Sequence, residues 1–277
     1  MAGLNSKELL AAFKEEGFAT VTLDKQAAAQ LRHTYRAARA FFDQPATKKN
    51  AARLPMDFGY RPFGVEYSQS PERPDLFESF SVNPNLFDGK RHLFVPESRS
   101  LYEIVSDTFC WLELIAEDVV VKLAAELSTQ SAAERLKGGL RNWSVLQINN
   151  GLSGPDNVEF SSESHEDGCL LTLMSNTGGG LEFVNGSNAA PAHLGADEIF
   201  VVAGDILHLL SGGAIRPLYH RVCAGGNEGR MALLYFADLD PSLCLPWINS
   251  EMNKHIDIGA RVRTNSVRHG LQIRHKI

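Results

Sequence analysis

Two histidines and one aspartate have the residue types and the spacing to hold a metal ion. His165 and Asp167 are two positions apart, and His220 lies further along the chain. In a strand, side chains two apart point to the same face, so His165 and Asp167 can share a metal while Glu166 points away. We expect His220 to come from another strand. Two imidazoles and one carboxylate can then occupy one face of an octahedral ion and leave the opposite face open.

Arg230 adds an anion-binding group to this set. It follows His220 by ten residues and immediately precedes the apolar run Met231–Phe236. An inward-pointing arginine in such a strand requires an anion, because a buried unpaired charge is costly. A guanidinium holds a carboxylate through two charge-assisted hydrogen bonds, worth roughly 1.5–3 kcal/mol. The set therefore favours the site of non-haem Fe(II) oxygenases over a catalytic zinc site, which the same three ligands could also form.

The composition is that of a chain able to bury a full core, with 277 residues of which 44% are hydrophobic. The net charge of −6 gives no overall basic surface, so we expect no nucleic-acid partner. No apolar run of about 18 residues and no charged-then-apolar leader occur, so we expect no membrane span, no signal peptide and a cytoplasmic protein. The four cysteines are far apart, which favours reduced, mostly buried thiols over a disulfide or zinc framework.

Helical patterns dominate the first half of the chain. Asn5 can cap a first helix, the residues Phe18–Leu23 alternate like a strand, and Asp24 can cap a second helix with an apolar stripe. Periodicity fails from about 45 to 98, where we expect long irregular chain. Apolar residues at helical spacing then predict a long amphipathic helix over Leu101–Leu123.

The second half consists of short apolar runs separated by glycine-rich turns, which is typical of a sandwich or barrel. Gly204-Asp205 is a two-residue hairpin signal. Because helices precede strands, we predict an α+β, mainly β fold, with an antiparallel double-sheet jelly roll backed by N-terminal helices. The predicted strands are Trp143–Ile148, Cys169–Met174, Leu181–Val184, Ile199–Val202, Ile206–Leu210, Tyr219–Val222 and Met231–Phe236.

A single domain is expected to span residues 1–277. It would comprise a helical N-terminal region with irregular loops over 1–138, a jelly-roll core over 139–240 and a C-terminal tail over 241–277. A domain of this size commonly stays undivided in mainly β proteins.

From about residue 8 to 240, the sequence resembles the isopenicillin N synthase-like family of Fe(II)- and 2-oxoglutarate-dependent dioxygenases. The closest segments are His165-Glu-Asp-Gly-Cys-Leu-Leu-Thr-Leu173, Phe200-Val-Val-Ala-Gly-Asp-Ile-Leu-His-Leu-Leu-Ser-Gly-Gly213 and Leu218-Tyr-His-Arg-Val222. The resemblance implies a distorted double-stranded β-helix. It also implies Fe(II) on His165, Asp167 and His220, and Arg230 on the distal carboxylate of 2-oxoglutarate. Dioxygen would be the second co-substrate, and a small-molecule metabolite would be hydroxylated, desaturated or cyclised.

Two positions depart from the family pattern. Ala232 stands where relatives usually keep a serine that shares the co-substrate carboxylate with the arginine. Losing that neutral hydrogen bond costs about 0.5–1.5 kcal/mol, so we expect weaker 2-oxoglutarate binding and not its loss. Where relatives carry tyrosines, this chain has Asn149 and Asn150. Either amide could act as the missing donor, although a strand-end turn explains an asparagine pair equally well.

The residues that choose the substrate have the weakest signal in the sequence. Candidates from the irregular middle region and the C-terminal segment are Tyr60, Arg61, Phe63, Phe80 and Trp247, each of which could equally belong to the core. The tail Asn249–Ile277 carries six Lys or Arg and two Asp or Glu. It could form a cationic lid over an anionic substrate, but a solvated helix paired with the acidic body is the favoured interpretation.

Two other functions remain open at this stage. An iron oxidase of the same family that does not use 2-oxoglutarate would fit Ala232. A catalytically silent jelly-roll binding protein is the other, since a fold alone does not establish an activity.

Overall fold

The computed structural model describes residues 5–127, 136, 138–244, 246–247 and 256–271. Its chain begins with helix α1 (Ser6–Glu15), strand β1 (Phe18–Thr22) and helix α2 (Lys25–Phe42). The predicted caps are confirmed, because the Asn5 side chain accepts hydrogen bonds from the first turn of α1 and Asp24 does the same for α2. Each cap satisfies backbone N–H groups that have no partner inside the helix.

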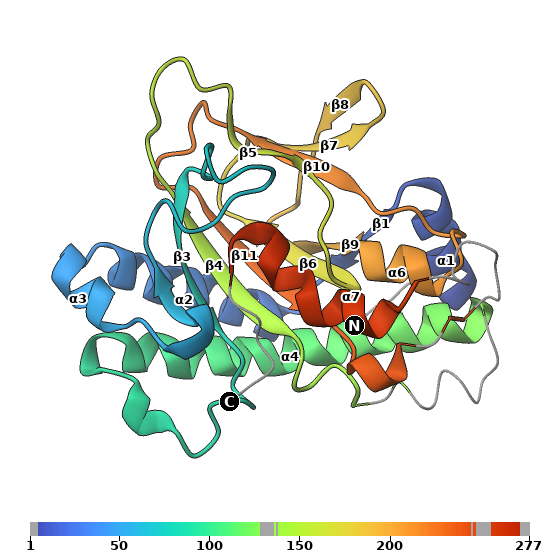
Figure 1. Cartoon of the computed structure of the whole chain (residues 1–277), viewed down its shortest axis with the longest axis horizontal. Coiled ribbons are helices and arrows are strands. Elements are labelled where there is room, and N and C mark those ends of the chain that lie inside the picture. Colours follow the sequence, from blue (N-terminus) through green and yellow to red (C-terminus); the bar gives the residue numbers. More distant parts are fainter. Residues whose placement is uncertain (1–4, 128–135, 137, 245, 248–255, 272–277) are drawn as a thin grey trace.

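The long helix α4 (Pro96–Leu127) lies along one face of the large sheet and supports it (Figure 1). Its apolar positions recur at helical spacing and form one buried stripe from Leu101 to Ala124. Phe109 meets Tyr235 of the sheet edge-on, with ring centroids 5.0 Å apart. The predicted helix over Leu101–Leu123 is thus confirmed, with one extra turn at each end.

The large sheet has seven strands, and all its paired neighbours are antiparallel. Its edge strands come from the N-terminal half, so this region completes the sheet and does not form a separate helical unit. In spatial order the strands are β1, β9 (Glu198–Ala203), β6 (Leu171–Asn176), β11 (Met231–Ala237), β4 (Val145–Gly151), β3 (Phe77–Val82) and β2 (Gly59–Arg61).

The small sheet stands opposite the large one (Figure 1). In spatial order it contains β5 (Phe160–His165), β10 (Tyr219–Cys223), β7 (Leu181–Asn185) and β8 (Asn188–Pro191). Two facing antiparallel sheets backed by helices confirm the predicted jelly roll. A cavity lies between the sheets, lined by residues from both.

Strand β11 shows how the sheet divides the interior. Ala232, Leu234 and Phe236 line the cavity, whereas Met231, Leu233 and Tyr235 are buried in the core cluster shared with the helices. Successive side chains of a strand point to opposite faces, so one strand serves both the core and the cavity. Two apolar faces on one strand also explain why its sequence reads as a continuous apolar run.

One predicted strand is wrong. Ile206–Leu210 lies within helix α6 (Asp205–Leu210), and Gly204 is the residue preceding that helix and not part of a hairpin. A five-residue segment with four apolar residues does not distinguish a buried strand from a buried helical turn. Glycine is required at 204 for a different reason, because a Cβ there would lie 2.1 Å from the carbonyl oxygen of Cys169.

The region expected to be irregular, 45–98, is more ordered than predicted. It contains strands β2 and β3 of the large sheet, which have only three and six residues and are therefore too short to show a clear period in the sequence. The remaining elements are α3 (Ala46–Ala51), η1 (Pro55–Asp57), η2 (Arg91–Leu93), η3 (Pro241–Leu243), α7 (Ile258–Thr264) and η5 (Asn265–His269).

All four cysteines are free thiols, as predicted. Cys169 and Cys244 are buried and Cys223 is half-buried, whereas Cys110 is exposed on α4 and departs from the expectation of burial. Among the described helices, none combines the length and the apolar character needed to cross a membrane.

Candidate metal centre

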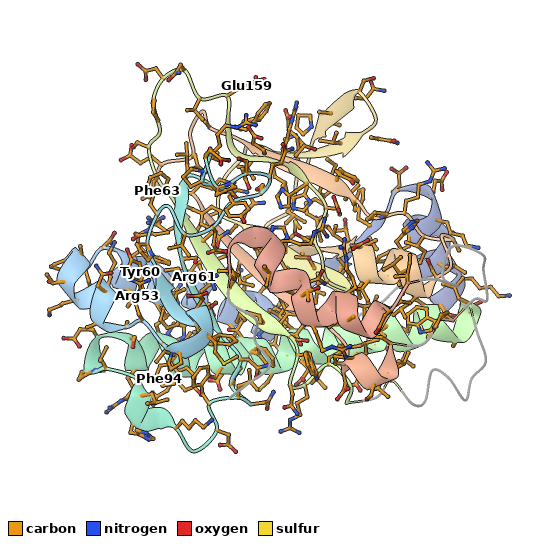
Figure 2. The ribbon with its side chains drawn as sticks, in the orientation of Figure 1. Arg53, Tyr60, Arg61, Phe63, Phe94 and Glu159 are labelled. Carbon is orange, nitrogen blue, oxygen red and sulfur yellow. The ribbon has the colours of Figure 1, made fainter. Side chains whose placement is uncertain are left out.

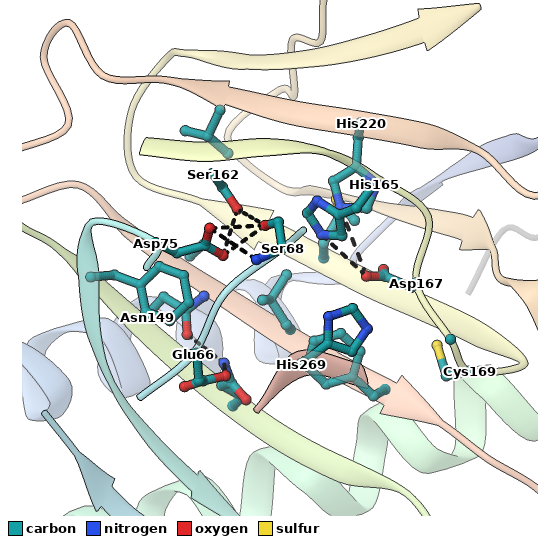
Figure 3. Close-up of a pocket in the computed structure, with 18 of the residues that line it drawn as sticks. Glu66, Ser68, Asp75, Asn149, Ser162, His165, Asp167, Cys169, His220 and His269 are labelled. Atoms are coloured by element: carbon teal, nitrogen blue, oxygen red, sulfur yellow. Dashed lines mark hydrogen bonds and ion pairs between the residues drawn. The ribbon is translucent and has the colours of Figure 1, made fainter. Parts of the chain in front are cut away.

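The three predicted ligands meet at one end of the interior cavity (Figure 3). His165 ends β5 and is paired in register with His220 of β10, so the small sheet sets the distance between the imidazoles. Asp167 lies beyond the strand end, in the turn that leads to β6. The expectation that His165 and Asp167 share a strand face is therefore wrong in detail, since the turn and not the strand pleat brings the carboxylate to the histidines.

The distances suit a single ion. Asp167 Oδ1 lies 3.8 Å from Nε2 of His165 and 3.8 Å from Nε2 of His220. With metal–ligand bonds of about 2.1 Å, two donors of one ion can be at most about 4.2 Å apart. All three donor atoms lie within 4.8 Å of one another, so a small contraction would bring them onto one cation.

Hydrogen bonds on the far side of the imidazoles set their tautomers. Nδ1 of His165 lies 2.6 Å from the Glu163 carbonyl oxygen, and Nδ1 of His220 lies 3.4 Å from that of Leu218. A carbonyl only accepts, so each Nδ1 carries the hydrogen and each Nε2 lone pair faces Asp167. Outer contacts of this kind orient metal-binding histidines.

Burial and mutual contact determine the charges of these groups. Burial lowers the pKa of His220 to about 4, which leaves its imidazole neutral near pH 7. Burial opposes ionisation of Asp167, but the two histidines and the hydroxyl of Thr172, which donates to Oδ2, together lower its pKa below the usual range. A charged Asp167 carboxylate beside the neutral imidazole of His220 is a state suited to binding a divalent cation.

Arg230 lines the same cavity, just before β11. Its Nε donates to the Gly179 carbonyl oxygen at 2.8 Å, which fixes the direction of the side chain. Burial lowers the pKa of the guanidinium, and no ion pair to a carboxylate is found for it within the described part of the chain. The half-buried arginine thus supplies a positive charge that faces the cavity.

The two asparagines of the predicted co-substrate site separate. Asn149 lines the cavity and is paired across the sheet with Ala232, whose other neighbour is Asn176. Asn150 points to the opposite face, where its amide donates to Glu78 at 3.1 Å and accepts from Arg39 at 3.1 Å. The expectation that Asn150 could donate to the co-substrate is therefore wrong, because adjacent residues of a strand face opposite sides of the sheet.

A buried carboxylate lies in the cavity wall beside strand β5, which ends in His165 (Figure 3). Asp75 is 8% exposed and accepts hydrogen bonds from the hydroxyls of Ser68 and Ser162, at 2.7 and 2.9 Å. Burial raises its pKa to about 6, although these hydrogen bonds and His165 act in the opposite direction. Glu66 lines the cavity nearby but is neutralised by Arg61 at 2.8 Å.

The C-terminal segment 256–271 closes the cavity beside the ligands. It contributes Val262, Arg263, Asn265, His269 and Leu271 to the lining. Outside the cavity it is tied to the body by ion pairs from Arg268 to Glu166 at 2.9 Å and from Arg261 to Asp205 at 2.7 Å. The favoured expectation, a basic segment paired with the acidic body, holds for these two arginines. Residues 249–255 and 272–277 of the predicted tail lie outside the described residues.

The five predicted substrate residues are absent from the cavity lining, and these assignments are corrected. Figure 2 labels three of them, Tyr60, Arg61 and Phe63. Tyr60 and Phe80 pack around Phe41 in the core, and Trp247 belongs to the same cluster. Phe63 is 49% exposed. Arg61 is buried, and its guanidinium donates hydrogen bonds to side chains that include Glu66.

Sequence reasoning also missed residues that do line the cavity. Ser68 and Asp75 lie in irregular chain without a period, and Asn265 and His269 lie in a segment interpreted only through its charge. Thr172, which supports Asp167, and Asp75, which begins Asp75-Leu-Phe-Glu-Ser-Phe80, both stood within segments that resemble the family. No sequence signal distinguished the others from ordinary loop residues.

Two family models match this chain. The model described as non-haem dioxygenase in morphine synthesis N-terminal matches residues 4–98, and that of the 2OG-Fe(II) oxygenase superfamily matches residues 143–238. The second match contains all three metal-ligand candidates and Arg230.

Curated relatives are moderately similar. The validamycin A dioxygenase of Streptomyces hygroscopicus subsp. limoneus is 29% identical over 237 residues, which cover 74% of this chain and 63% of that protein. Gibberellin 2-beta-dioxygenase 4 of Arabidopsis thaliana is 26% identical over 219 residues, which cover 71% and 64%. The chain therefore spans less than two thirds of the length of these relatives.

Solved structures share the fold at lower identity. The dioxygenase for auxin oxidation 1 from Arabidopsis thaliana, in a binary complex with 2-oxoglutarate, matches with a TM-score of 0.68 and 17% identity, covering 84% of this chain and 87% of that one. A putative 2OG-Fe(II) oxygenase family protein from Caulobacter crescentus matches with a TM-score of 0.73 and 21% identity, covering 94% and 92%. The two family models, which jointly match more than half of the sequence, together with the curated relatives, show that the chain belongs to the 2OG-Fe(II) oxygenase superfamily.

Proposed function

We propose that this protein is a non-haem Fe(II)- and 2-oxoglutarate-dependent oxygenase that oxidises a small-molecule metabolite. The observation that carries the proposal is the sharing of one cavity by the ligand set His165, Asp167 and His220 and by the arginine Arg230. A metal ion with an open face and a half-buried guanidinium are the two attachment points that a short keto diacid needs.

His165, Asp167 and His220 would hold the iron. When bound, Fe(II) would supply the activation of dioxygen, and the protein's own contribution is binding, orientation and exclusion of water. The register of β10 against β5 fixes the imidazoles, and Thr172 holds the carboxylate. The presence of a carboxylate ligand at Asp167 argues against a halogenating variant, which would need a small residue there.

Arg230 and Asn149 would bind the distal carboxylate of 2-oxoglutarate. Ala232 lacks the usual hydroxyl, but it lies between Asn149 and Asn176, both of which line the cavity. The Asn149 Oδ1 accepts from Gln147 at 2.8 Å, which turns its amide nitrogen away from that contact. Asparagine N–H groups at either side of Ala232 can donate to a carboxylate as a serine hydroxyl would.

The proposal is tested by adding Fe(II) and then 2-oxoglutarate to the protein under anaerobic conditions. A charge-transfer absorption that appears only after 2-oxoglutarate is added supports the proposal. Iron binding without that band would favour an oxidase that does not use 2-oxoglutarate, and failure to bind iron would favour a silent binding protein. A matched control is Asn150→Ala, which removes an asparagine from the opposite sheet face and is expected to leave the band unchanged.

A further inference from the structure

The cavity extends beyond the proposed metal and co-substrate sites. The wall of this additional part, which lies beside His165 and Asp167, is built from two segments outside the central strands of the sheets. One segment is the loop before β3, which contributes Ser68 and Asp75. The other is the C-terminal segment 256–271, which contributes Asn265 and His269. If the proposed function is right, a substrate must lie in this part, because it adjoins His165 and Asp167.

Asp75 is a buried carboxylate whose charge is not neutralised by a cation. Its partners are the hydroxyls of Ser68 and Ser162 and the backbone N–H of Ser68, and no salt bridge joins it to Lys or Arg among the residues described. The nearby arginines are used elsewhere, since Arg61 pairs with Glu66 and Arg73 with Glu163. A buried charge without a counter-charge is costly unless a ligand compensates it.

Asn265 is a second polar group without a partner. Its side chain is deeply buried, since only 7% of the residue is exposed, and neither amide atom has a hydrogen-bond partner within the described regions. It packs against Gly168, the residue after Asp167, where an added Cβ would lie 2.9 Å from Asn265 Oδ1. Buried amides are nearly always hydrogen-bonded, so an unpaired one at a cavity wall indicates that a ligand supplies the bonds.

The cations of the C-terminal segment do not change this balance. Arg261 and Arg268 are directed to Asp205 and Glu166 on the body. Arg263 lies 3.8 Å from Asp257, and 45% of its side chain is exposed. His269 presents its ring to that of His165, with centroids 6.1 Å apart. On this wall the positive charge of Arg263 is therefore paired with Asp257 and shared with solvent, whereas the negative charge of Asp75 has no Lys or Arg partner among the described residues.

We propose that the substrate is a neutral or positively charged molecule bearing hydroxyl or amino groups, one of which donates to Asp75 while another polar group bonds the Asn265 amide. The surrounding lining is apolar, through Phe77, Leu181 and Val222 among others, so the molecule also carries a hydrocarbon skeleton. An anionic substrate, which a cationic lid would have suited, meets repulsion from Asp75.

The test uses probes that share one skeleton and differ in one group: cyclohexylmethylamine, cyclohexylmethanol and cyclohexanecarboxylate. Each is titrated by calorimetry at pH 8 into the anaerobic protein loaded with Fe(II) and 2-oxoglutarate. We expect the amine to bind at least tenfold more tightly than the carboxylate, and Asp75→Asn to reduce that ratio to about threefold or less. Equal or tighter binding of the carboxylate, binding by neither amine nor alcohol, or an amine affinity unchanged in Asp75→Asn would overturn the inference.

The same samples separate this inference from the proposed function. The charge-transfer band recorded before titration reports on 2-oxoglutarate binding, so its absence refutes the proposed function, whereas a wrong probe preference with the band present refutes only the substrate class.

A second variant tests Asn265 through stability. Asn265→Leu should leave the thermal midpoint of the metal-free protein unchanged or higher, and should weaken binding of the alcohol and amine probes. In the matched control Asn83→Leu, which removes a satisfied buried amide that donates to Ser144 at 2.8 Å, the midpoint should fall. A fall in Asn265→Leu equal to that in Asn83→Leu, or unchanged probe binding, would contradict a ligand-binding role for Asn265.

Discussion

Replacement of Asp75 by asparagine should make the metal-free protein more stable at neutral and alkaline pH. The substitution keeps the size of the side chain and removes its buried negative charge. The Ser68 and Ser162 hydroxyls can rotate to donate or accept, so their contacts with an amide can be retained. Substitutions commonly increase stability at residues that are retained for ligand binding at the expense of stability.

The magnitude follows from the pKa of Asp75. Burial raises the pKa from 3.8 to about 6, which corresponds to a penalty of about 2–3 kcal/mol on the charged form in the folded state. Because the folded-state pKa lies above the unfolded one, the penalty is complete above pH 6 and absent below about pH 4. The stability gain of Asp75→Asn should therefore be largest at pH 7–8 and should disappear as the pH falls through 6 toward 4.

Urea denaturation with EDTA present, repeated between pH 4.5 and 8, measures this difference. The effect of His220, whose pKa is also shifted, is common to both proteins and cancels. Glu66→Gln is the matched control with the opposite sign, because it strips the buried Arg61 of its partner and should cost about 3–5 kcal/mol. A variant no more stable than wild type at pH 8, or a difference that does not vary with pH, would refute the reasoning about Asp75.

Three further outcomes are expected. Asp167→Ala should abolish Fe(II) binding and iron-dependent turnover, and retention of full activity without added halide would contradict its assignment as a ligand. Arg230→Gln should raise the Kd for 2-oxoglutarate about 10- to 150-fold, and Ala232→Ser should lower that Kd about two- to tenfold, from the free energies of charge-assisted and neutral hydrogen bonds. Titration of the charge-transfer band measures both Kd values. Kd values equal to that of the wild type would refute the assignment of Arg230 to the co-substrate carboxylate. Glu166→Gln should remove the ion pair to Arg268, which as a partly exposed pair contributes about 0.2–1 kcal/mol. Amide hydrogen exchange in η5 should therefore become about two- to fivefold faster. Unchanged exchange would show that packing alone holds this segment.

Local patterns in the sequence predicted much of the framework. The caps at Asn5 and Asp24 and the stripe of α4 confirm that capping and helical spacing depend on near neighbours. The failure at Ile206–Leu210 has the same origin, because its four apolar residues around His208 satisfy both a strand and a helical turn. In each case the evidence lay within a few residues of the element itself.

The sequence by itself determined the chemistry of the site, through two imidazoles, a carboxylate and an arginine at a spacing compatible with strands. Only the tertiary structure decided which other groups meet them. It placed Asn149 inside the cavity and Asn150 outside, and it joined Asp75 to Ser162 across the interior.

The physical reason is the range of the interactions. A strand's alternation is local, but which of its two faces borders a cavity depends on the sheet that packs opposite. The wall formed by the loop before β3 and by segment 256–271 depends on long-range contacts such as Glu166 with Arg268, 102 positions apart. A single sequence contains the groups for such contacts without indicating their partners, so the metal ligands could be recognised in advance whereas the substrate wall emerged only from the folded chain.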